Sequence, residues 1–201
     1  MKWRLVPLVI CGLATAAAAP GPRDPDWPCQ QIKVPRLSLA AVWSGPALGG
    51  QLGDWRQDPQ VSDLVRTIAQ RRVPLDQVQG KIHEFAAQAG DQKEPKLLLA
   101  LSGVFGLLDD ERSSVIDGLD RFGARQKELA AVLREDTEKL RKMQSDPASD
   151  AGEVNQMEER VTWEGRVFQD RRQALSYACD VPAKIEQRLF GISRAIQEAL
   201  E

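Results

Sequence analysis

The sequence has very little of the chemistry on which enzymes and metal sites depend. Its one histidine, His83, stands beside Glu84 in KIHEFAA, whereas metal ligands on a helix need i, i+3 or i+4 spacing. We interpret His83 as a surface or boundary residue, with a catalytic base as the alternative. No glycine-rich phosphate loop, G-x-S-x-G, H-E-x-x-H or calcium-loop spacing occurs. We therefore expect no cofactor, no metal and no enzymatic activity, with an enzyme that lacks a recognisable motif as the less favoured alternative.

Long apolar runs are lacking beyond the N-terminus. Two basic residues, a mostly apolar run over 5–13 and a small-residue tract over 14–19 are typical of a secretory signal peptide. The apolar run has about 15 residues, against the roughly 20 that a membrane span requires. We expect residues 1–19 to be removed by cleavage after Ala18 or Ala19. The remaining chain is then periplasmic or secreted, with no stable membrane insertion.

An excess of positive charge is also lacking. Without Lys2 and Arg4 the chain has 25 Lys and Arg against 29 Asp and Glu, a net charge of −4, and the two signs alternate along the chain. Binding to phosphate backbones needs clustered positive charge. Nucleic acid is therefore not an expected partner.

Cysteine is scarce, and only Cys29 and Cys179 remain after the leader. An exported protein meets an oxidising environment that favours pairing, so we expect one disulfide between them. Closing a loop of about 150 residues is worth roughly 4 to 5 kcal/mol in the chain-entropy picture. A redox pair is the alternative, but the C-x-x-C spacing of such pairs is absent.

Residues 20–57, which we call the strap, are rich in proline and glycine but carry Trp27, Trp43 and Trp55. Proline and glycine disfavour regular structure, while large apolar side chains disfavour free solvation. We predict an extended segment that is pressed on a helical body and tethered by the disulfide. The tryptophans are interpreted as core residues, with a ligand-binding aromatic site as the alternative.

Helical signals begin at Asp58, a good N-cap followed by proline at the first helical position. Pro74 is expected to start a second helix, which carries an apolar stripe and ends at Gly90. A third helix is expected from Pro95. Its sequence KLLLALSGVFGLL is apolar nearly all round, so we predict a buried helix in which Gly103 and Gly106 allow a neighbour to approach closely.

The strongest pattern is a heptad repeat. Apolar residues step by four and three over 115–143 and again over 154–182, and QSDPASDAGE at 144–153 is a turn by composition. Two such arms form an antiparallel coiled-coil hairpin, each arm having 29 residues and a length of about 43 Å.

The predicted fold is therefore all-α, with a small helical bundle as its base, a protruding antiparallel coiled-coil hairpin and an extended N-terminal strap. Its expected parts are the signal peptide 1–19, the strap 20–57 and the helical domain 58–201. Within that domain, the base comprises 58–114 and 183–201, and the hairpin comprises 115–182.

Four core positions of the hairpin are polar, namely Gln126, Asp136, Glu164 and Arg171. Matching the arms across the turn places Gln126 beside Arg171 as a cross-pair. It also places Asp136 near Val161 and Glu164 near Leu133. Polar residues in a coiled-coil seam fix its register. The alternative is that they weaken the apolar seam so that a partner helix can enter.

The stretch DWPCQQIKVPRLSLAAVWSGP, residues 26–46, resembles the start of uncharacterised exported helical proteins of Gram-negative bacteria. The resemblance covers the whole mature chain and implies no known activity.

We expect a non-enzymatic protein that acts as a scaffold or assembly factor by presenting its hairpin to another periplasmic protein. The expected partner-binding residues are the turn 144–153 and the seam residues Leu129, Leu133, Val161 and Phe168. A periplasmic holdase chaperone that uses the seam or the strap is the alternative. A weak cation site at the turn, from Asp146, Asp150 and Glu153, is a further alternative.

Overall fold

The computed structural model describes residues 24–48 and 54–201. Over these residues the chain forms five α-helices, three short 3-10 helices and no β-strand, so the all-α prediction is confirmed. The α-helices are α1 Pro59–Ile68, α2 Leu75–Ala89, α3 Lys93–Ser145, α4 Ala151–Ala178 and α5 Val181–Leu200. The predicted signal peptide and its cleavage site lie outside the described residues.

Helix α1 begins and helix α2 ends where their capping residues predict. The Asp58 carboxylate accepts hydrogen bonds from the backbone N–H groups of Gln60 at 2.9 Å and Val61 at 3.1 Å. It thereby satisfies two donors that a helix N-terminus leaves free. The Val61 hydrogen bond is the main reason why the pKa of Asp58 lies below its ordinary value. At the other end of the pair, Gly90 follows α2 with a φ of +53°, which glycine adopts without strain.

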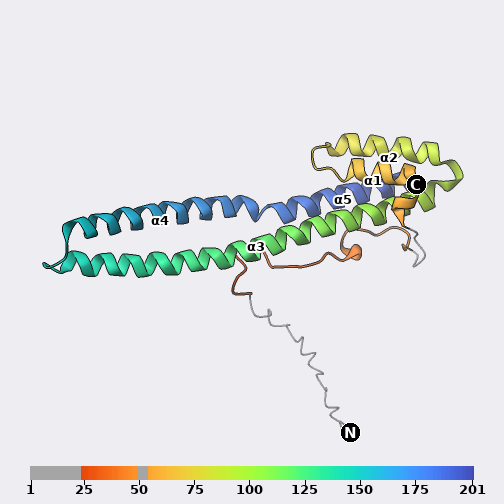
Figure 1. Ribbon diagram of the computed structural model, residues 1–201. Coiled ribbons are helices and arrows are strands. Elements are labelled where there is room, and N and C mark those ends of the chain that lie inside the picture. The colour runs from red at the N-terminus through yellow and green to blue at the C-terminus, as the bar shows by residue number, and fades with distance from the viewer. Residues whose placement is uncertain (1–23, 49–53) are drawn as a thin grey trace, which may run out of the picture.

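The third helix is much longer than predicted. It begins at Lys93 and continues for 53 residues to Ser145, so the expected central helix and the first hairpin arm are one continuous element. Pro95 lies in its first turn, where a missing N–H removes no intrahelical hydrogen bond. At 1.5 Å per residue, α3 is about 80 Å long and runs from the base to the tip of the hairpin (Figure 1).

The main core lies in the base, where α1, α2, the first third of α3 and α5 meet. Its fully buried side chains include Val61, Val65, Ile68, Ile82, Leu97, Leu101, Ile185, Leu189, Ile192 and Ile196. Two residues of the strap, Trp43 and Trp55, complete the same core. No residue between Val115 and Val181 belongs to it, so the hairpin contributes nothing to the main core.

Of the two glycines expected at a close approach, only one has that role. A Cβ on Gly103 would lie 2.8 Å from the indole of Trp55 and 3.0 Å from Val65, so this glycine makes room for a strap tryptophan. Gly106 is exposed and has nothing within 4 Å of such a Cβ, and the expectation for it was wrong.

The hairpin projects from the base as two antiparallel helices, the second half of α3 and α4 (Figure 1). They are joined by residues 146–150, and the carboxylate of Asp150 caps α4 by accepting from Gly152 N and Glu153 N. The second arm was expected to continue to Pro182, but α4 ends at Ala178 and α5 begins at Val181. Pro182 lies in the first turn of α5, where proline is tolerated, whereas it would disrupt an uninterrupted helix.

Candidate partner-binding hairpin and its tethered strap

The strap is joined covalently to the end of α4. Cys29 and Cys179 form a disulfide with a Cα–Cα distance of 5.6 Å, as their scarcity in the sequence predicted. Beside it, Gln31 Nε2 donates to the carbonyl of Cys179 at 3.4 Å. The bond fixes residue 29 at the point where α4 gives way to α5.

Ion pairs hold the strap along α3 on both sides of the disulfide. Lys33 Nζ lies 2.6 Å from carboxylate oxygens of both Asp24 and Asp120. These hydrogen bonds, that of Asp120 first, raise the pKa of Lys33 above its ordinary value. Lys127 lies 2.8 Å from Asp26. The N-terminal part of the strap is thus anchored by charges on α3 as well as by the disulfide.

Further along the strap, the anchors are buried. The Asp109 carboxylate accepts from Leu37 N at 2.8 Å and from Arg36 at 2.9 Å. Arg112, whose side chain is 5% exposed, donates to the Val34 carbonyl at 2.6 Å. These bonds satisfy backbone groups that an extended segment would otherwise leave without partners.

The strap also crosses α3 at a very close distance, at Gly123. A Cβ at this position would collide with the backbone carbonyl of Asp26 and would lie 3.1 Å from Cδ of Pro28. Gly123 is buried by this contact. One side of the hairpin is therefore already covered by the protein's own strap.

The tryptophans of the strap do not form an open aromatic site. Trp43 and Trp55 are each 9% exposed and belong to the core of the base. Trp27 is half-buried, and its indole donates to the Gln31 carbonyl at 2.6 Å. The interpretation of Trp43 and Trp55 as core residues is confirmed.

The four expected partner-binding residues lie where α3 faces α4. Leu129 and Leu133 come from α3, Val161 and Phe168 come from α4, and all four are half-buried. Only their outer edges face solvent as long as the two helices stay together. Their role in binding a partner stays a prediction.

Polar residues in the seam are arranged differently from the prediction. Gln126 donates to the backbone carbonyl of Phe168 at 2.9 Å, while Arg171 is exposed, so the expected Gln126–Arg171 pair was wrong. The guanidinium of Arg160 instead lies 2.9 Å from Asp136 and 3.0 Å from Glu164. The hydrogen bond to Glu164, followed by the charge of Asp136, raises the pKa of Arg160.

Asp136 and Glu164 are almost fully buried, at 8% and 7% exposed. One oxygen of each, Asp136 Oδ2 and Glu164 Oε2, accepts no hydrogen bond from the described residues. Asp136 Oδ2 is the oxygen that lies 2.9 Å from Arg160, so that contact is an ion pair without hydrogen-bond geometry. A single half-exposed arginine thus contacts two carboxylates inside the seam and balances the charge of only one of them.

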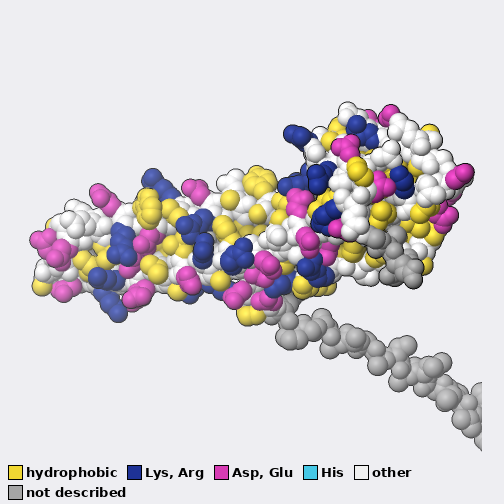
Figure 2. All heavy atoms as spheres, turned by 45° about the vertical axis from the view of Figure 1, so that its right-hand side comes forward, with side chains coloured by type: hydrophobic (Ala, Val, Ile, Leu, Met, Phe, Trp, Pro, Cys, Tyr) yellow, Lys and Arg dark blue, Asp and Glu magenta, His cyan; other side chains and the backbone are white. Residues whose placement is uncertain are grey.

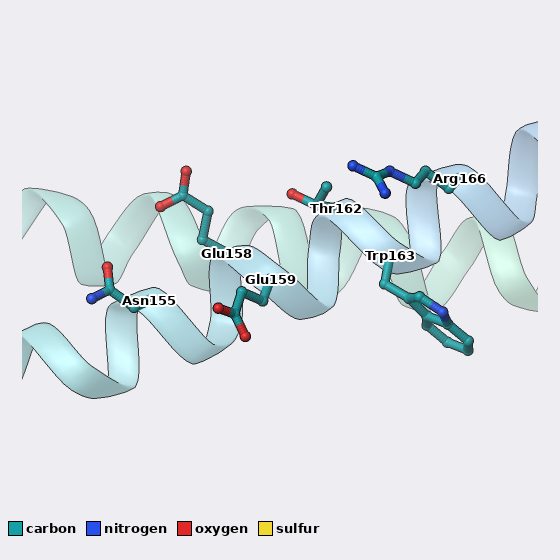
Figure 3. Close-up of a pocket in the computed structure, with 6 residues that line it drawn as sticks. All are labelled: Asn155, Glu158, Glu159, Thr162, Trp163 and Arg166. Carbon is teal, nitrogen blue, oxygen red and sulfur yellow. The ribbon is translucent and has the colours of Figure 1, made fainter.

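The outer face of α4 carries the hairpin feature that the sequence analysis missed. Trp163 is 65% exposed, one of the few large apolar side chains that the described residues leave in solvent. It lines a shallow, open depression with Asn155, Glu158, Glu159, Thr162 and Arg166, all from α4 (Figure 3). Elsewhere on the visible face of the hairpin, side chains of both charges are interspersed with separate apolar patches (Figure 2).

A metal-binding arrangement is not found in the described residues. No group of three or more His, Cys, Asp or Glu side chains there is placed to hold a metal ion. His83 is exposed on α2. At the turn, Asp146 and Asp150 accept hydrogen bonds from backbone N–H groups and so act as local caps.

Compared with models of known families, with curated proteins and with solved structures, the chain matches none of them. Among the helices that the structure describes, none combines the length and apolar character needed to cross a bilayer.

Proposed function

We propose that this is a periplasmic or secreted, non-enzymatic protein that presents its hairpin to another protein, as a scaffold or assembly factor. The observation that carries the proposal is the separation of the hairpin from the main core, which contains no residue between Val115 and Val181. A segment of this length that lies outside the main core needs another reason for its form. Protein binding is such a reason, since paired helices offer a long, rigid surface.

Two further observations support the proposal. The disulfide is compatible with an oxidising compartment outside the cytoplasm. An exposed tryptophan on the hairpin also favours protein binding, because tryptophan is among the residues that contribute most at interfaces. A holdase chaperone is less well supported, because the seam residues are half-buried and Trp43 and Trp55 lie in the core.

The proposal is tested by photo-crosslinking in the exporting cell. A photoreactive amino acid replaces Thr162, which is exposed on α4, or, as the matched control, His83, which is exposed on α2 of the base. We expect Thr162 to give a discrete crosslinked protein and His83 to give none. Crosslinks from His83 alone would move the partner site to the base.

A shortened hairpin provides the second arm of the test. Removing 133–143 and 154–164 takes equal lengths from both helices and leaves the turn 144–153 in place. Eleven residues are close to three helical turns, so the helical phase is nearly kept. The base should stay folded, because its core lies elsewhere. Co-purification of the crosslinked partner should be lost, and its retention at equal affinity would contradict the proposal.

A further inference from the structure

We propose that Trp163 and Glu159 form the part of the hairpin that binds an arginine or lysine side chain on a basic segment of the partner. This inference rests on the proposed function and adds the chemistry of the partner. Glu159 precedes Trp163 by four residues, which places both on one face of α4. In Figure 3 the two side chains project to the same side of the helix, while Arg166 projects to the other.

The first step of the argument is that the Trp163 ring is free to accept a cation. A cation over the face of an indole is attracted by its quadrupole, and tryptophan is the strongest aromatic partner for such contacts. Within the described residues, cations lie over Trp27 and Trp55, where Lys33 and Arg56 occupy the rings. No such cation lies over Trp163, which is 65% exposed.

The second step is the charge around the ring. Glu159 makes no ion pair within the described chain and projects to the same side of α4 as Trp163, whereas Glu158 and Arg166, which also line the depression, project to the other side (Figure 3). Arg160, the nearest base toward the tip, is already paired with Asp136 and Glu164. On the side of α4 to which the indole projects, the charged residue that lines the depression is therefore Glu159, which presents a negative group to a partner. It attracts a cationic side chain and repels a carboxylate.

The third step is the shape of the surface. The depression is open and is lined by residues of a single helix, so it has no walls that would bury an apolar anchor on all sides. An aliphatic side chain placed here would keep much of its surface in water. A guanidinium or ammonium group gains from the ring and from the Glu159 carboxylate even when it stays partly hydrated. The geometry thus favours a basic segment over an apolar one.

The experiment selects random 12-residue peptides, displayed on phage, against the oxidised chain 20–201 and compares their binding with that to variants. We expect enriched peptides to carry Arg or Lys. Their Kd should rise about tenfold for Trp163→Ala, in line with a partly desolvated cation–π contact. A smaller rise is expected for Glu159→Gln. Replacing the basic residue of the peptide by Gln should have a comparable effect.

The matched control is Tyr177→Ala. Tyr177 is an exposed aromatic residue on the same helix, 67% exposed and fourteen residues further along, and its removal should leave the Kd unchanged. Enriched peptides without a basic residue would overturn the inference. So would peptides that bind Trp163→Ala as well as they bind the wild type, or no enrichment at all.

Two other occupants of the Trp163 surface are tested in parallel. A concentration-dependent dimer in sedimentation that Trp163→Ala abolishes would assign the surface to a second copy of the chain. Binding to phosphatidylglycerol vesicles that depends on Trp163 would assign it to a lipid surface. Either result overturns the inference. The proposed function has its own test, and it fails if crosslinks from Thr162 are absent. If those crosslinks persist unchanged in Glu159→Lys, the proposed function survives and only the inference about Glu159 fails.

Discussion

Arg160 of α4 lies 2.9 Å from the carboxylate of Asp136 of α3 and thereby joins the two arms of the hairpin across their seam. The same guanidinium bonds Glu164 one turn further along α4, at 3.0 Å. Burying a carboxylate costs much unless a charge or hydrogen bonds compensate it. The hairpin therefore depends on one half-exposed arginine to keep two buried acids in place.

The first prediction concerns this arginine. Arg160→Ala leaves Asp136 and Glu164 buried without their cation, so the thermal midpoint of unfolding, followed by circular dichroism, should fall. Adding Asp136→Leu and Glu164→Leu should restore the midpoint, because apolar residues in a seam need no compensation. The matched control is Arg141→Ala, which removes only an exposed pair with Glu138. Equal effects of Arg160→Ala and Arg141→Ala would contradict the explanation.

The second prediction concerns the cap of α1. Asp58→Ala should lower the free energy of unfolding by about 1 kcal/mol at neutral pH, a typical effect of losing an N-cap. The folded pKa of Asp58 is lowered, mainly by the hydrogen bond from Val61 N, so its contribution is present above the unfolded pKa of about 3.9. The contribution is lost as the pH falls through the folded value.

Denaturant titrations at several pH values measure this difference. The gap between wild type and Asp58→Ala should close at low pH, whereas Asp63→Ala, an exposed change in the interior of α1, should have little effect at any pH. A gap that stays constant down to pH 2 would show that the carboxylate does not act as a charged cap.

The features that sequence patterns predicted are those set by heptad periodicity, by helix-capping residues or by the small number of cysteines. Heptad spacing predicted two antiparallel arms, Asp58 and Gly90 marked helix ends, and the two remaining cysteines indicated their pairing. The start of α3 at Lys93 was missed because Pro95 was taken as the first residue, although a proline in the first turn is compatible with an earlier start. The continuity of α3 was missed because the apolar run after Pro95 and the heptad steps from Val115 were interpreted as separate helices. The end of α4 was missed because the heptad pattern continues past Ala178.

The outer surface of the hairpin could not be predicted from the heptads. A heptad assigns the seam and treats every other position as solvated, so Trp163 was left without a role although it lies two residues after the seam position of Val161. Arg160 was likewise treated as a solvated residue, because only the conformation of its side chain shows that it reaches Asp136. The course of the strap has no periodicity. Cys29 and the tryptophans indicated that the strap is held on the helices, and a glycine inside a coiled-coil arm, Gly123, is consistent with its close approach there.

The third prediction concerns the leader. The basic residues, apolar run and small-residue tract of the first 19 positions predict cleavage after Ala18 or Ala19. N-terminal sequencing of the exported protein should therefore begin at residue 19 or 20. A mature protein that still begins at Met1 would remove the basis for a periplasmic or secreted location.

The fourth prediction concerns the disulfide. Cys29→Ser should lower the free energy of unfolding by about 2 to 5 kcal/mol, because the unfolded chain regains the entropy of a loop of 150 residues. Denaturant unfolding measures the loss. Non-reducing peptide mapping of protein exported by the cell should find Cys29 joined to Cys179, and two free thiols there would refute the tether.

The fifth prediction separates the packing of the strap from its covalent link. Gly123→Ala introduces a Cβ that collides with the Asp26 carbonyl, so the strap must move away while the disulfide stays intact. Hydrogen exchange should become faster at the backbone amides within residues 26–31 that donate hydrogen bonds, those of Asp26 and Trp27 to Asp24, and the hydrogen bond from Trp27 Nε1 to the Gln31 carbonyl should weaken. The base should keep its protection, because Gly123 lies outside the main core.

Gly165→Ala is the matched control for this change. It lies in the other arm of the hairpin and has nothing within 4 Å of a built Cβ, so alanine should fit without a clash. Because alanine favours helix over glycine by up to about 1 kcal/mol, Gly165→Ala should stabilise the protein. The same preference acts at Gly123, and only the approach of the strap opposes it there. If Gly123→Ala also stabilised the protein and left the exchange of the Asp26 and Trp27 amides unchanged, the strap would not pack on α3 as closely as Asp26 and Gly123 indicate.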